Sequence, residues 1–243
     1  MYPRYKTPLN AYAMVIGSML SGRKKNIRLI AMRILIGMTQ PPVVFGEENI
    51  SEDGPFLLTM NHYTREGFSI IWAAAAISAL LPGEPLWVMT NAWTNRSGFF
   101  DQIRTNISKA VFTRFAEVFG LITMPSMPPH PDEMMDRAIS IRKLFKQIDG
   151  KSNIILCLAP EGQDQTGGLL GKPHPGTGKF IYSLYSQLER VLPVGIYEQQ
   201  GRLVVEFGPA YELEDNKTTD QEVINQVMRQ IGNLIPEEFI PER

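Results

Sequence analysis

The sequence has little of several features that would assign it to a narrow class. It has one cysteine among 243 residues, so no disulfide can form within the chain, which agrees with a reducing compartment. Its formal net charge is −1, which gives no reason to expect nucleic acid as a partner. The cysteine, Cys157, lies in the apolar run 154–158 and is predicted to be a small buried hydrophobe.

Long hydrophobic runs are also missing. The run 9–20 is interrupted by Asn10 and Ser18, and the run 27–38 contains Arg28 and Arg33. A membrane-spanning helix needs roughly 20 predominantly apolar residues, so neither run predicts one. No clear small-residue cleavage site follows the first run, which argues against a signal peptide.

These two runs flank the basic cluster Arg23-Lys24-Lys25, and apolar residues recur at helical spacing in the second run. Two interpretations follow. The segment is either an amphipathic helical region that lies in a membrane interface, with its cations near anionic headgroups, or a helical hairpin packed on the protein's own core.

From about residue 42, short apolar runs alternate with helical patterns. The alternation predicts an α/β fold with a mostly parallel central sheet covered by helices on both faces. A turn at 199–201 is expected to join the last two strands. The predicted strands are 43–45, 56–60, 86–89, 121–124, 153–159, 191–197 and 202–207, and the clearest helices are 68–81, 132–148, 179–190 and 219–231.

Polar residues follow two of the predicted strands, at 60–67 and at 159–164. Ligands of open α/β sheets collect at the carboxyl ends of strands, so both segments are expected to face one pocket. His62 precedes Glu66 by four residues, and on a helix the two side chains would share a face. The carboxylate would then orient the ring as a general base. By spacing alone, a helix-capping or core histidine remains the alternative.

Other reactive patterns are not found. His130 and His174 lack metal-ligand spacing with another His or Cys, so no metal site and no cofactor are predicted. The stretch 176–179 departs from a phosphate-binding loop, and there is no Gly-x-Ser-x-Gly nucleophile elbow.

Three blocks together resemble the glycerolipid (lysophospholipid) acyltransferase family, over about residues 46–213. They are Asn61-His62 after an apolar strand, Pro160-Glu161-Gly162 about a hundred residues later, and Leu192-Pro193-Val194-Gly195. The resemblance implies transfer of a fatty acyl group from acyl-CoA or acyl-carrier protein to a glycerolipid hydroxyl, with His62 as base. It implies acceptor binding by Glu161 and Gly162.

The resemblance also implies an organisation and a location. Residues 1–40 would form an N-terminal amphipathic helical segment in contact with a membrane, and residues 41–243 the acyltransferase-like α/β domain. The protein would be cytoplasmic and peripheral on the membrane.

Two positions depart from the family pattern. Gly67 stands where the family has the aspartate that follows its histidine, and Asp164 stands where it has an arginine that would bind the acceptor's phosphate. Glu66 is predicted to replace the aspartate and Lys172 to contribute to acceptor binding. We therefore expect an acceptor less anionic than lysophosphatidate, or another alcohol. A non-catalytic lipid-binding member of the same fold is the alternative, and a soluble hydrolase using the same pocket is a third.

Overall fold

The computed structural model describes residues 5–51, 54–92, 99–127, 130–164, 166–188, 190–214 and 219–241. The strands are β1 (Val43–Phe45), β2 (Phe56–Met60), β3 (Pro85–Thr90), β4 (Ile122–Met124), β5 (Ile155–Leu158), β6 (Val191–Gln199) and β7 (Arg202–Phe207). The helices are α1 (Leu9–Ser21), α2 (Ile27–Leu35), α3 (Ile70–Leu80), α4 (Phe99–Phe119), α5 (Met134–Ile148), α6 (Thr177–Leu188) and α7 (Asp220–Gly232).

The strands form a seven-stranded sheet in the order β1-β7-β6-β2-β5-β3-β4. Neighbours from β6 to β4 run parallel, as do β1 and β7, whereas β6 and β7 are antiparallel. The turn between β6 and β7 carries positive φ at Gln200 (51°) and Gly201 (76°), as a tight hairpin requires. The predicted fold class and the predicted hairpin are confirmed.

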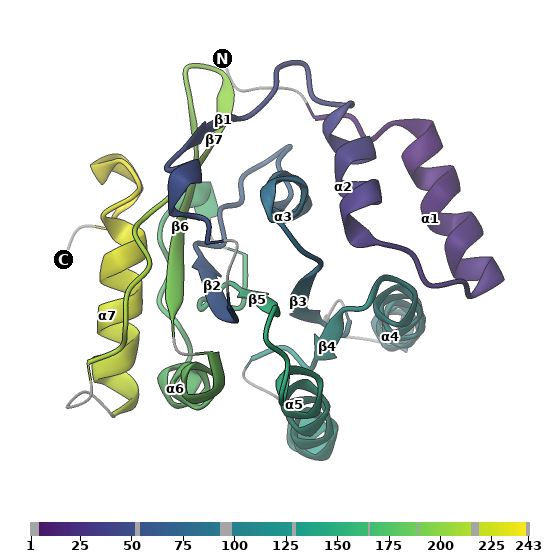
Figure 1. Ribbon diagram of the computed structural model, residues 1–243. Helices are drawn as coiled ribbons and strands as arrows, with labels where there is room; N and C mark the ends of the chain where they lie inside the picture. Colours follow the sequence, from purple (N-terminus) through teal and green to yellow (C-terminus); the bar gives the residue numbers. More distant parts are fainter. Residues whose placement is uncertain are drawn as a thin grey trace.

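Each central strand supplies side chains to two apolar layers. In β2, Phe56, Leu58 and Met60 pack into one cluster, while Leu57 packs into the other. The first cluster lies under α2, α3 and α4 and the second under α5, α6 and α7, as the arrangement in Figure 1 shows. A sheet covered on both faces explains the continuous hydrophobic runs of β2 and β5. Cys157 is fully buried in the first layer, as predicted.

The two N-terminal helices differ in how they are buried. α2 packs on α3 and buries Ile30 and Ala31, whereas α1 packs outside it and exposes an apolar face. The large apolar side chains exposed on the pair are Leu9, Tyr12, Ile16, Leu20, Leu29, Met32 and Ile36. Within the described residues, no helix combines the length and the hydropathy needed to cross a bilayer.

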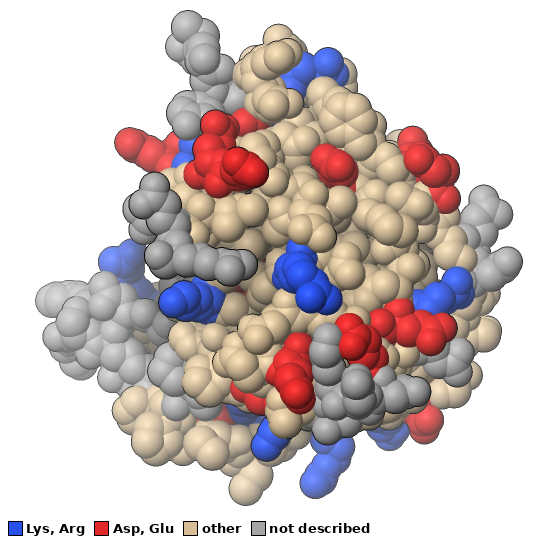
Figure 2. All heavy atoms as spheres, turned by 90° about the vertical axis from the view of Figure 1, so that its left-hand side faces the viewer, with Lys and Arg blue, Asp and Glu red and all other residues tan. Residues whose placement is uncertain are grey.

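The opposite face of the molecule has a different surface. Helix α7 begins at the N-cap Thr219, where a capping box with Glu222 satisfies backbone N–H groups. Its apolar side, with Val223, Val227 and Ile231, is buried in the second layer. Figure 2 shows acidic and basic side chains interspersed over this side of the molecule.

Candidate active site

His62 lies two residues beyond the end of β2, and its backbone is held by a carboxylate from the neighbouring strand. The His62 N–H donates to Glu161 Oε2 (2.5 Å), and the Gly171 N–H donates to Glu161 Oε1 (2.9 Å). This contact is possible because β2 and β5 are parallel neighbours, with Thr59 opposite Leu158, so their carboxyl ends meet. The two segments that were expected to face one pocket therefore do lie together.

Glu161 is a buried hydrogen-bond acceptor that joins two loops. Its side chain is fully buried, and burial raises the pKa of Glu161 to about 7, although hydrogen bonds from backbone N–H groups, those of Gly171 and His62 first, act to lower it. In this conformation the Glu161 side chain has no exposed surface and does not line the neighbouring cavity. Glu161 therefore contributes by holding the loop of His62 and the loop of Gly171 in place.

The His62 ring is partly exposed and has a second carboxylate beside it. Nδ1 is buried without a hydrogen-bond partner among the described residues, and Asp164 Oδ1 lies 3.5 Å from it. The His62 side chain is 16% exposed and that of Asp164 is 84% exposed. Burial lowers the pKa of His62, while the charge of Asp164 acts to raise it. Because burial dominates, the ring is neutral at neutral pH, which is the form that a general base needs.

Asn61 fixes the end of β2 against β6. Its side-chain amide donates to the Ile196 carbonyl (2.8 Å) and its side-chain oxygen accepts from the Ile196 N–H (2.7 Å). Both groups are buried, so the pair continues the sheet ladder beyond the last residue of β2. The residue before the candidate base is thus immobilised from the other neighbouring strand.

The condition under which His62 and Glu66 would share a helical face, a helix over residues 62–66, is not met. Residues 65–68 form a tight turn, closed by a hydrogen bond from the Phe68 N–H to the Arg65 carbonyl (3.0 Å), and α3 begins only at Ile70. Within the described part of the chain, the Glu66 carboxylate forms no hydrogen bond or ion pair with His62. The turn chemistry overrides the four-residue spacing.

Gly67 has a structural reason to be glycine. Its φ is +78°, and a Cβ there would come within 3.3 Å of Arg65 Nη1. Side chains other than glycine are strained in this conformation. An aspartate at position 67, as in the family pattern, would require a different turn.

A buried cluster behind the turn was not foreseen from the sequence. Glu198, on β6, accepts hydrogen bonds from Tyr5 Oη (2.6 Å), Tyr63 Oη (2.9 Å) and Arg65 Nη2 (2.7 Å), and it also pairs with Arg65 Nε. The charge of Arg65 is balanced by Glu198. The signal available in the sequence was a glutamate within an otherwise apolar strand.

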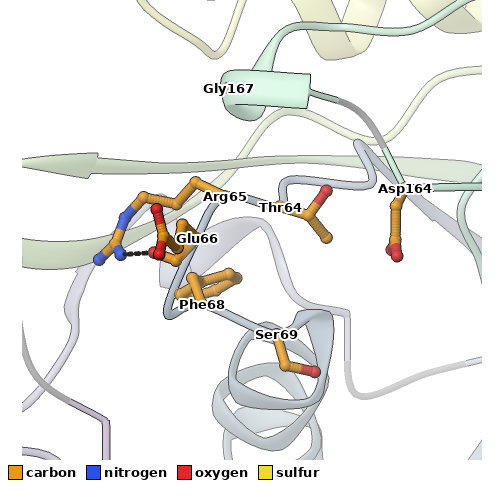
Figure 3. Close-up of a pocket in the computed structure, with 7 residues that line it drawn as sticks. All are labelled: Thr64, Arg65, Glu66, Phe68, Ser69, Asp164 and Gly167. Carbon is orange, nitrogen blue, oxygen red and sulfur yellow. Dashed lines mark hydrogen bonds between the residues drawn. The ribbon is translucent and has the colours of Figure 1, made fainter.

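A cavity of about 390 Å³ adjoins these groups. Figure 3 shows Asp164, Thr64 and Ser69 around it, with the turn at Glu66 on one side and Gly167 above. His62 is not part of the cavity wall but lies next to it through Asp164. The lining residues are Thr64, Arg65, Glu66, Phe68, Ser69, Asp164 and Gly167.

The remaining predicted residues lie outside this wall. Gly162 is exposed in the turn after β5, where its φ of 66° lets the chain bend between Glu161 and Asp164. Lys172 is exposed, one residue beyond Gly171, whose N–H is bonded to Glu161. The structure thus brings together His62, Glu161 and Asp164, and it places Glu66 across the turn from them.

Comparison with known proteins identifies the architecture. No family model and no curated protein sequence matches the chain. Among solved structures, the crystal structure of the 1-acyl-sn-glycerophosphate (LPA) acyltransferase PlsC from Thermotoga maritima is similar, with a TM-score of 0.54 and 14% sequence identity. The match covers 86% of this chain and 78% of that one. The chain has an acyltransferase-like fold.

Proposed function

We propose that the protein transfers a fatty acyl group from a thioester donor, acyl-CoA or acyl-carrier protein, to a hydroxyl of a glycerolipid, with His62 as general base. One observation carries the proposal. In an acyltransferase-like fold, a partly exposed, neutral histidine lies at the carboxyl end of a central strand, with one ring nitrogen buried beside a carboxylate. This leaves Nε2 as the nitrogen that can accept a proton.

The chemistry needs no covalent enzyme intermediate. His62 Nε2 takes the proton of the acceptor hydroxyl, and the oxygen attacks the thioester carbonyl carbon. The tetrahedral intermediate then collapses, the C–S bond breaks, and the leaving thiolate takes the proton from the imidazolium. The products are an ester and the free thiol of the carrier.

The charges around the cavity favour an acceptor less anionic than a phosphate monoester. Two carboxylates, Glu66 and Asp164, line the cavity, and the guanidinium of Arg65 is neutralised by Glu198. A dianionic phosphate would meet like charge without a compensating cation in that wall. Lys172 is an exposed cation in the loop that follows, and we retain it, with Gly162, as a candidate contact for the acceptor's headgroup.

We further propose that α1 and α2 bring this site to a membrane surface. Their exposed apolar side chains include Leu9 (85% exposed) and Leu20 (81% exposed), and the basic residues Arg23, Lys24 and Lys25 are exposed at the junction. Apolar side chains with adjacent cations are the two features that interfacial helices use on anionic membranes.

Acyl transfer with the purified chain tests the proposal. Release of free thiol and formation of ester would be followed with acyl-CoA and a panel of lysolipids and neutral alcohols. His62→Ala is expected to lower the rate by about 10²- to 10⁴-fold. His130→Ala is the matched control, since His130 also pairs with an aspartate but is exposed beside α5. Full turnover by a folded His62→Ala variant would eliminate the proposed base.

The pH dependence gives a second check. The folded-state pKa of His62 is lowered, so the base stays neutral below its ordinary value of about 6.5. The rate is therefore expected to hold as pH falls through 6.5 and to drop only when the lowered pKa is reached. Because the His62 pKa is lower in the folded than in the unfolded state, the free energy of unfolding is higher above pH 6.5. It decreases as pH falls from about 6.5 through the lowered pKa. A His62 ring that titrates at pH 6.5 or above, followed by NMR to distinguish it from Glu161 with its pKa of about 7, would contradict this assignment.

Gly67 and Asp164 keep a non-catalytic lipid-binding protein as the second candidate, since both replace groups that the resembling family uses. Lipid that co-purifies with the chain, with no turnover of any acyl donor, would favour it. Loss of acyl-CoA at one rate with and without acceptor would instead indicate hydrolysis.

A further inference from the structure

We infer that Asp164 is the positioning residue of His62, so that the orienting carboxylate comes from the loop after β5 and not from the histidine's own loop. The inference deepens the proposed function and rests on it for its catalytic consequence. The geometric part, a pairing between Asp164 and the Nδ1 side of the ring, can be measured independently of any activity.

The first support is the environment of Nδ1. This nitrogen is buried and has no hydrogen-bond partner among the described residues, and the carboxylate oxygen that faces it is Asp164 Oδ1 at 3.5 Å. That separation is slightly longer than a hydrogen bond, as is common for catalytic pairs before substrate is bound. A small movement of the exposed Asp164 side chain would satisfy the orphaned ring nitrogen.

The second support is the way the two loops are tied together. Glu161 holds the backbone N–H of His62, and Asp164 follows only three residues later, after the bend at Gly162. The same loop therefore fixes the main chain of the histidine with a buried carboxylate and approaches its ring with an exposed one. Neither contact depends on the sequence neighbours of His62.

The third support is that the alternative partner is directed elsewhere. Glu66 sits in the turn 65–68, and no hydrogen bond or ion pair links its carboxylate to the ring in the described structure. Gly67 cannot supply a carboxylate, and its positive φ disfavours any side chain there. In the part of the chain that the structure describes, the turn at 65–68 thus leaves the ring without a carboxylate from its own loop, and Asp164 is the carboxylate that lies beside it.

Pairing with Asp164 selects the ring state that acyl transfer needs. A proton on Nδ1 points to Asp164, which leaves the Nε2 lone pair free for the acceptor hydroxyl. When Nε2 takes the proton, the carboxylate stabilises the resulting imidazolium. A bound acceptor over Asp164 excludes the water that screens this highly exposed side chain.

Titration of His62 by NMR in the full chain tests the pairing. Asp164→Asn is expected to lower the His62 pKa by about half a pH unit, because an exposed partner contributes weakly. Asp164→Glu should restore most of the shift. The Glu161 carboxylate also faces His62 through its backbone N–H and titrates near neutral pH, but it is common to all variants. An unchanged pKa in Asp164→Asn, or an equal shift in Glu66→Gln, would overturn the inference.

Kinetics then separate positioning from a structural effect. Asp164→Asn is expected to lower kcat about tenfold with little change in the KM for acyl donor, and to move the acid limb of the pH–rate profile down by the same amount as the pKa. Asp164→Glu should recover part of kcat. An unmoved acid limb in an enzyme that depends on His62 would refute the role. If the wild-type chain transfers no acyl group, the proposed function fails, while the NMR result still decides the pairing.

Discussion

The helices on the two faces of the sheet treat their apolar residues in opposite ways. On one face, α7 turns Val223, Val227 and Ile231 into the core and leaves polar side chains outside. On the other, α1 directs Leu9, Ile16 and Leu20 outward. The apolar side of α7 is covered by its own domain. An exposed apolar side such as that of α1 is typical of a surface that contacts a membrane or another partner. The contrast is the physical basis for proposing a membrane contact through α1 and α2.

The largest expected effect is on binding to a lipid membrane. The double variant Leu9→Glu/Leu20→Glu should lose more than about 100-fold in binding to anionic vesicles, since burial of each leucine is worth about 1.5–3 kcal/mol. Co-sedimentation with vesicles measures it.

The matched control for this variant changes charge equally on the opposite face. Asn225→Glu on α7 with Gln187→Glu on α6 alters two exposed residues there and should leave vesicle binding within about twofold. Equal losses in both double variants would remove the contrast between the faces and leave only a general charge effect.

A smaller effect is expected on stability. Ile231→Ala, in fully buried surroundings, should lower the free energy of unfolding by about 2–5 kcal/mol. Ile16→Ala, more than half exposed on α1, should change it by no more than about 0.5 kcal/mol. Urea denaturation without lipid measures both. A large loss in Ile16→Ala would mean that α1 is part of the core in solution.

The smallest expected effect is the loss of stability when the N-cap residue of a helix is removed. Thr219 caps α7, and the Asn26 side chain caps α2 by accepting from the Arg28 N–H (2.7 Å). Replacing either residue by alanine should cost about 1 kcal/mol of stability. Only Asn26→Ala is expected to weaken vesicle binding as well, because of these two helices only α2 belongs to the proposed membrane-contact face. If Thr219→Ala weakens binding to the same degree, the effect is global unfolding.

Much of the fold was predictable because its signals are local. The alternation of short apolar runs with helical patterns predicted a sheet covered on two faces, and the turn at 199–201 was predicted to join the last two strands. The predicted helix 219–231 corresponds to α7, whose N-cap is Thr219. These features depend on side-chain periodicity and turn chemistry, which are readable from neighbouring residues.

The site was only partly predictable because its contacts are long-range. His62 and Glu161 were identified together from the family resemblance, and they share a hydrogen bond. Glu66 was predicted as the partner of the His62 ring from a four-residue spacing on a helix, and the turn at 65–68 does not provide that helix. Asp164 was noted only as a missing arginine. Only the parallel pairing of β2 with β5 brings it to the histidine.

Glu198 connects the segment before α1 with the turn that lines the cavity. One buried carboxylate accepts bonds from Tyr5, ahead of the first helix, and from Arg65, in the turn that walls the cavity. Tyr5 also contacts Phe68 of the cavity wall directly, with 5.0 Å between the ring centroids. A purification tag fused in front of Tyr5 would act on both contacts, so the activities of fusions at the two termini should be compared before a weak rate is ascribed to the chemistry.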